Sequence, residues 1–173
     1  AASFAARRGA PDVMVGAGAA YATFAVMGAG AVGCIAAGRL ADRVGRARVA
    51  IGAMAISGAC CVLAGPAFGA HPALVLALGL VWGVTVVADS AQFSASVAEL
   101  AEPGLAGTLL TVQTSLGFAL TLATIQAMPW LVARLGWQGG AFAVLAIGPA
   151  LGCLAMARLR ASPMAARLAG GRG

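Results

Sequence analysis

Five apolar runs, each about as long as a membrane-spanning helix, divide this chain of 173 residues. A helix of about twenty apolar residues crosses the hydrocarbon core of a bilayer. Short polar breaks separate the runs, which we place at residues 13–37, 49–68, 72–96, 105–128 and 141–159. The sequence therefore predicts an all-α bundle of about five transmembrane spans. A basic tail at residues 160–173, expected to be disordered, follows the last span.

Composition supports a membrane protein. Apolar residues make up 61% of the chain and charged residues only 9%, against about a quarter charged in a soluble domain. The net charge is +6, but the arginines lie at the ends of the apolar runs and not on one water-facing surface, which argues against nucleic acid as a partner. The four cysteines lie within apolar runs and lack metal-ligand spacing. We expect a lipid bilayer as partner, and no metal or cofactor.

The most polar stretch lies between the first two runs, at residues 38–48, and is called the hinge below. It reads Gly-Arg-Leu-Ala-Asp-Arg-Val-Gly-Arg-Ala-Arg and holds four of the eleven arginines. Arginine is costly to move into hydrocarbon, so the hinge is expected at the membrane surface.

The hinge resembles the signature loop of major facilitator superfamily transporters, Gly-x-Leu-Ala-Asp-Arg-x-Gly-Arg followed by a basic residue. Its matching positions are Gly38, Leu40, Ala41, Asp42, Arg43, Gly45 and Arg46. A departure is Ala47, where the family usually has Arg or Lys. The resemblance implies a twelve-helix fold in two halves, of which this chain looks like helices eight to twelve. The partner would then be the missing N-terminal half, and Asp42, Arg43 and Arg46 would belong to a cytoplasmic latch.

The arginines also predict an orientation. Eight lie in the hinge or toward the tail, and three lie on the other side: the first set is Arg39, Arg43, Arg46, Arg48, Arg158, Arg160, Arg167 and Arg172, the second Arg7, Arg8 and Arg134. Because cytoplasmic loops carry an excess of basic residues, we expect the hinge and the C-terminus in the cytoplasm and the N-terminus outside. The membrane would be an inner or plasma membrane.

Polar residues in the third run suggest a pathway through the membrane. Asp89 is the sole acid inside an apolar run, and an ionisable group there is a functional candidate by default. Trp82, Thr85, Asp89, Gln92, Ser96 and Glu99 follow one another at helical spacing and share one face. We predict that Trp82, Thr85, Asp89 and Gln92 line a central pathway, with Thr111 and Thr114 joining from the next span.

Structural roles for these residues remain open. Asp89 lies near the predicted cytoplasmic end of its helix, where it can pair with hinge arginines instead of binding a proton or substrate. Threonine in membrane helices often bonds its own backbone. We also predict that Arg43 or Arg46 pairs with Glu99 or Asp89, since both acids lie toward that face of the membrane.

A dinucleotide-binding pattern, Gly-x-Gly-x-x-Gly, occurs at residues 28–33. It stands in the middle of an apolar run with no preceding strand, so close helix packing is the better interpretation. The sequence shows no catalytic triad or intramembrane catalytic pair, and we do not expect an enzyme. The favoured function is secondary transport of a small molecule by alternating access. The alternative is a non-transporting multi-span scaffold or sensor subunit.

Overall fold

The computed structural model describes residues 12–67, 69–138 and 140–171, and these form a bundle of helices. Within these ranges no strand occurs, and five helical segments are long and apolar enough to cross a membrane. The predicted all-α fold with five spans is therefore confirmed. The α-helices and the two 3₁₀-helices (η) follow in the order α2 (Asp12–Val44), α3 (Arg46–Ala64), α4 (Pro72–Leu100), α5 (Ala106–Leu135), η1 (Ala143–Ala146), α6 (Ile147–Arg160) and η2 (Pro163–Gly170).

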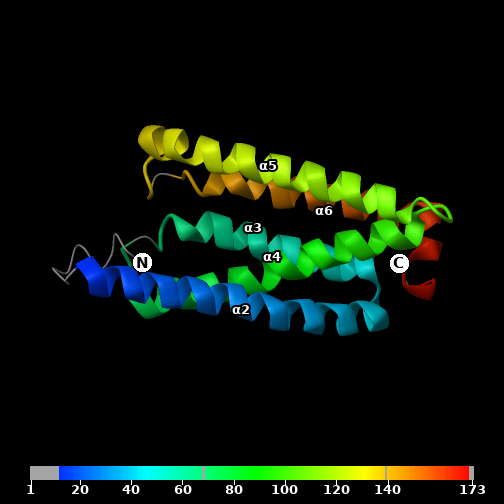
Figure 1. Ribbon diagram of the computed structural model, residues 1–173, viewed down its shortest axis with the longest axis horizontal. Coiled ribbons are helices and arrows are strands. Elements are labelled where there is room, and N and C mark those ends of the chain that lie inside the picture. Colours follow the sequence, from blue (N-terminus) through cyan, green and yellow to red (C-terminus); the bar gives the residue numbers. More distant parts are fainter. Residues whose placement is uncertain (1–11, 68, 139, 172–173) are drawn as a thin grey trace.

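The long helices lie side by side along the long axis of the molecule (Figure 1). The turn from α2 to α3, the end of α4 and the 3₁₀-helix η2 gather at the right end of Figure 1, which is called the hinge end below. The turns that follow α3 and α5 lie at the opposite end. The hinge and the tail therefore share one end of the bundle, as the even number of spans between them requires.

Helix α4 is the helix on which the others assemble. Helices α2, α3 and α5 all pack against α4, and α6 packs against α3. Small side chains allow these approaches: one buried cluster joins Ala37 and Ala41 of α2 to Val49 and Ala53 of α3 and to Ala88 of α4. Close packing of small residues is a main source of helix association in membranes, where no hydrophobic driving force acts between helices.

Helices α2 and α4 come closest at three glycines. A Cβ atom on Gly30 would lie 2.5 Å from the Cγ2 atom of Val87. At Gly33 it would overlap the carbonyl oxygen of Val84, and at Gly83 that of Val26. Gly30 and Gly33 belong to the dinucleotide-like pattern, so this pattern serves helix packing, as the sequence suggested.

Three helices extend past the ends predicted from the sequence. Helix α2 runs through most of the hinge to Val44, and α4 continues to Leu100, so that it includes Glu99. Helix α5 does not stop before Pro129 but continues to Leu135. The end predicted at residue 128 is wrong, because the one backbone N–H that Pro129 lacks is tolerated in a membrane helix.

The second and fifth spans also differ from their predicted limits. Helix α3 begins at Arg46 and ends at Ala64, just before Gly65 and Pro66. The predicted end of this span, residue 68, lies outside the described residues. The fifth span starts as the 3₁₀-helix η1 and becomes α-helical at Ile147. Pro149 explains this start, since it lacks an N–H and its ring disfavours α-helix over the preceding turn.

The tail is ordered where the structure describes it, which corrects the expectation of disorder after residue 160. Residues Pro163–Gly170 form η2, which contacts both α4 and α6 at the hinge end. The Leu168 side chain is fully buried there. Burying one leucine contributes about 1.5–3 kcal/mol, which holds the segment in place.

We predict that Gly33→Ala destabilises the bundle by about 1–3 kcal/mol, because the added methyl group overpacks the contact between α2 and α4. Gly28→Ala in the same helix is the matched control: a Cβ there would meet no atom within 4 Å. We expect this control to leave stability unchanged or raise it slightly, since Ala favours a helix over Gly. Denaturation of the purified protein in detergent, followed by circular dichroism, compares the two. Equal losses of stability would contradict the close contact.

Candidate functional site

The hinge turns at a single residue, Gly45. Its backbone has φ 100° and ψ 144°, a region that is open essentially to glycine alone. The Gly45 N–H donates to the carbonyl of Ala41 at 2.9 Å, and its own carbonyl accepts from the N–H of Val49 at 3.4 Å. The hydrogen bonds of the two helices thus continue across the turn, and Ala41 beside it is fully buried.

The other matching glycine, Gly38, has a different environment. It lies within α2, and a Cβ there would meet no atom within 4 Å. The two glycines of the hinge are therefore not equivalent in this structure.

We predict that Gly45→Ala costs about 1–3 kcal/mol of stability, because alanine is strained at this φ and ψ. Gly38→Ala is expected to be neutral or stabilising by up to about 1 kcal/mol, since it replaces glycine inside a helix. Thermal unfolding of both variants in the same detergent provides the comparison. A Gly38→Ala loss as large as that of Gly45→Ala would rule out the assignment of the turn to Gly45.

An ion pair joins the hinge to α4. The Nε and Nη2 atoms of Arg46 each lie 2.7 Å from the Oε1 atom of Glu99. The side chains are partly buried, with 17% and 28% of their surfaces exposed. Asp42 also approaches Arg46, but at 3.9 Å and with its side chain 70% exposed. Of the pairings expected from the sequence, the structure thus contains Arg46 with Glu99, while Arg43 is exposed.

We predict that Arg46→Ala destabilises the protein by about 1–3 kcal/mol, because it removes two charge-assisted hydrogen bonds to Glu99. Arg43→Ala, three residues earlier and exposed, should leave stability unchanged. A double-mutant cycle with Glu99→Ala measures the interaction, expected at about 1 kcal/mol for a partly exposed pair. A coupling of zero would show that the pair adds nothing to stability.

Part of the polar face predicted along the third span is buried between helices. Thr85 and Gln92 are buried in the helix packing, with 7% and 1% of their surfaces exposed. The Thr85 hydroxyl lies 3.0 Å from the carbonyls of Val81 and Trp82, on its own helix. Trp82 packs edge-on against Phe142, with ring centroids 6.1 Å apart. These three predicted residues therefore lie in helix packing and not on an open groove.

A groove with both polar and apolar lining instead opens between α4 and α5. Its volume is about 410 Å³, within the range of about 300–1,000 Å³ for small-molecule sites. The residues that line it are Ser90, Phe93, Ser94 and Val97 of α4 and Gln113, Thr114, Gly117, Phe118 and Thr121 of α5. Of the residues predicted for a pathway, this set contains Thr114.

One hydrogen bond crosses the groove. The Nε2 atom of Gln113 donates to the Ser94 hydroxyl at 3.3 Å. The Oε1 atom of Gln113 is buried and has no hydrogen-bond partner within the described part of the chain. A buried polar atom without a partner is costly.

Asp89 is connected to the groove through its neighbour. The Ser90 hydroxyl lies 3.1 Å from both the Oδ1 atom of Asp89 and the carbonyl of Val86. Ser90 lines the groove, whereas Asp89 is half-buried beside it. A change in the charge of Asp89 would therefore change whether the Ser90 hydroxyl donates to Asp89 or to the carbonyl of Val86.

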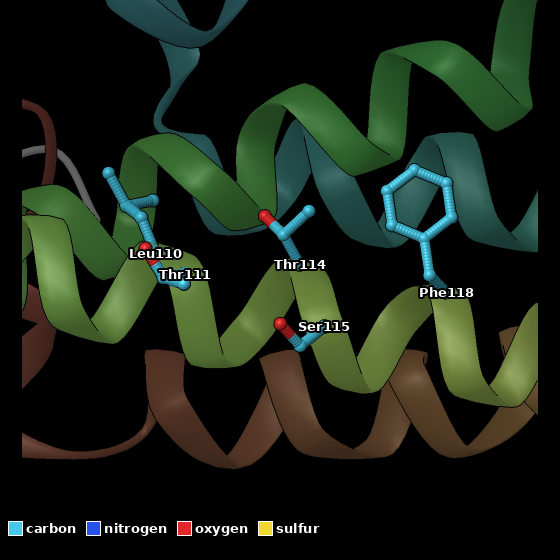
Figure 2. Close-up of a pocket in the computed structure, with 5 residues that line it drawn as sticks. All are labelled: Leu110, Thr111, Thr114, Ser115 and Phe118. Atoms are coloured by element: carbon cyan, nitrogen blue, oxygen red, sulfur yellow. The ribbon is translucent and has the colours of Figure 1, made fainter.

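A second hollow lies on α5 and has a volume of about 290 Å³. Figure 2 shows the five side chains that line it, all on one stretch of α5: Leu110, Thr111, Thr114, Ser115 and Phe118. Thr114 and Phe118 belong to both hollows. The Thr111 hydroxyl donates to the carbonyl of Gly107 at 2.9 Å, the backbone bond that the sequence left as an alternative. Thr111 and Thr114 thus lie together at the surface of α5.

Except for Thr114, all residues that line the groove were missing from the predicted pathway, among them Ser90, Phe93, Ser94 and Gln113. The spacing of polar residues along one helix cannot tell which face meets a neighbour. The glycines that seat α4 against α2 were the available signal, because they fix how α4 is rotated. No group of three or more His, Cys, Asp or Glu that could hold a metal ion occurs among the described residues.

Comparison with protein families, with curated proteins and with solved structures finds no match to this chain.

Proposed function

We propose that this protein is part of a secondary transporter of the major facilitator type, which moves a small solute across a membrane by alternating access. The groove between α4 and α5 carries the proposal. Serine, threonine and glutamine side chains would be poorly placed against lipid, and a hollow lined by them within membrane-spanning helices suits a hydrated solute. In alternating access, two halves of a transporter move about a central site.

The hinge would act at the cytoplasmic side of this transporter. The described arginines at the hinge end are Arg39, Arg43, Arg46, Arg48, Arg158, Arg160 and Arg167, against Arg134 at the other end. This excess favours a cytoplasmic hinge end. The Arg46–Glu99 pair ties the hinge to α4, which also forms one wall of the groove. Movement of α4 would therefore reach the hinge directly, and Asp42 and Arg43 at the surface would contact the other half.

Asp89 is the proposed coupling residue. It is held by Ser90 at the edge of the groove, so binding of a proton and occupation of the groove would influence each other. In the full-length protein reconstituted into vesicles, Asp89→Asn should abolish uphill accumulation driven by a proton gradient. Exchange of solute without a gradient should stay within about twofold, because asparagine keeps the size and hydrogen bonding of aspartate but cannot cycle a proton.

The control is Glu102→Gln, which removes an exposed acid from the loop after α4 and should leave both activities intact. Unchanged accumulation in Asp89→Asn would limit Asp89 to a structural role. Failure of the full-length protein to move any solute of a broad panel would overturn the transporter and favour a scaffold or sensor subunit.

A further inference from the structure

The groove between α4 and α5 is neutral. Among the residues described by the structure, those that line the groove are polar or apolar but carry no charge. The nearby acid, Asp89, contacts Ser90 and is not itself part of the lining. A charged solute leaving water needs an opposite charge in its site, since an unpaired ion in a low-dielectric region is costly. The groove therefore favours an uncharged solute.

Hydrogen-bond acceptors in the groove come from two hydroxyls. The Oε1 atom of Gln113 is buried and is therefore not counted among the groups that a solute reaches. The Thr121 hydroxyl donates its proton to the carbonyl of Gly117 at 2.9 Å, and the Ser90 hydroxyl faces two acceptors on its own helix. The protons of these two hydroxyls are thus engaged, and their oxygen lone pairs are left for a solute.

Donors come from two other hydroxyls. The Ser94 oxygen accepts from Gln113, which leaves its proton available. The Thr114 side chain lines the groove, and its hydroxyl can donate as well as accept. The groove therefore offers both donors and acceptors. A hydroxyl group is the simplest solute group that both donates and accepts, so this arrangement suits a solute with several of them.

Two aromatic rings complete the lining. Phe93 comes from α4 and Phe118 from α5. Aromatic rings contribute large apolar contact area beside polar groups, and the C–H faces of a polyhydroxylated ring or chain can pack on them. Gly117 also lines the groove, and a Cβ there would meet no atom within 4 Å. This glycine keeps the groove open.

We propose that this groove binds an uncharged solute with several hydroxyl groups, of the polyol or monosaccharide class. The proposal rests on the transport function above, because it names the solute class of that same site.

The test uses the full-length protein in nanodiscs and radiolabelled probes that differ in charge. Glucose, ribose, mannitol and inositol are the neutral probes, and glucosamine and gluconate add a positive or negative charge to the glucose skeleton. We expect at least one neutral probe to bind, and its charged counterparts to bind at least tenfold more weakly. Gly117→Leu should weaken binding of the neutral probe at least tenfold by filling the groove.

Gly107→Leu is the matched control. Gly107 is also a glycine of α5 with no atom within 4 Å of a Cβ, but it does not line the groove, so binding should be unchanged. The proposal is overturned if no neutral probe binds, if glucosamine or gluconate binds as well as glucose, or if the two leucine variants behave alike.

Uptake into vesicles separates this proposal from the transport function. If a charged solute crosses the membrane and no neutral probe binds, the proposed transport function stands and the proposed solute class is rejected. If a neutral probe binds, Gly117→Leu weakens this binding, and the probe does not cross the membrane, the proposed binding site stands and the transport function is rejected.

Discussion

The close approach of α2 to α4 determines the arrangement of the bundle. Gly30, Gly33 and Gly83 let the two backbones approach until no side chain fits between them. In a membrane, such packing replaces the hydrophobic effect as the reason for helices to associate. Once α4 is seated on α2, its remaining faces have fixed directions: one is covered by α3, and another meets α5. The groove exists because this rotation turns Ser90 and Ser94 toward α5.

The residues of the hinge divide between those that make contacts within this chain and those exposed at its surface. Ala41 fills the core, Gly45 makes the turn, and Arg46 binds Glu99. Leu40 and Arg43 are exposed. The resemblance to the transporter loop therefore has two parts. One part shapes the hinge end of this bundle, and the other faces outward, where the proposed second half would lie.

Sequence reasoning succeeded where one property decides the outcome. The length of each apolar run predicted five helices, because a helix must satisfy its backbone hydrogen bonds across the bilayer. It failed at helix ends such as Pro129, where the penalty for a missing hydrogen bond depends on the surroundings. The Arg46–Glu99 pair was predictable, since the hinge and the end of α4 had to share one face. The burial of Thr85 and Gln92 was not, because it depends on the rotation of α4 against two neighbours.

The groove has one stiff wall and one compliant wall. Helix α4 is held by contacts on several sides, whereas none of the residues of α5, all of which the structure describes, is buried. A helix with no fully buried residue can shift without uncovering a core, so its displacement costs little free energy. The width of the groove therefore depends on the position of α5, the less firmly held of the two helices. At the proposed site, solutes of somewhat different size would be accommodated by movement of α5 alone, while the contact between α2 and α4 stays intact.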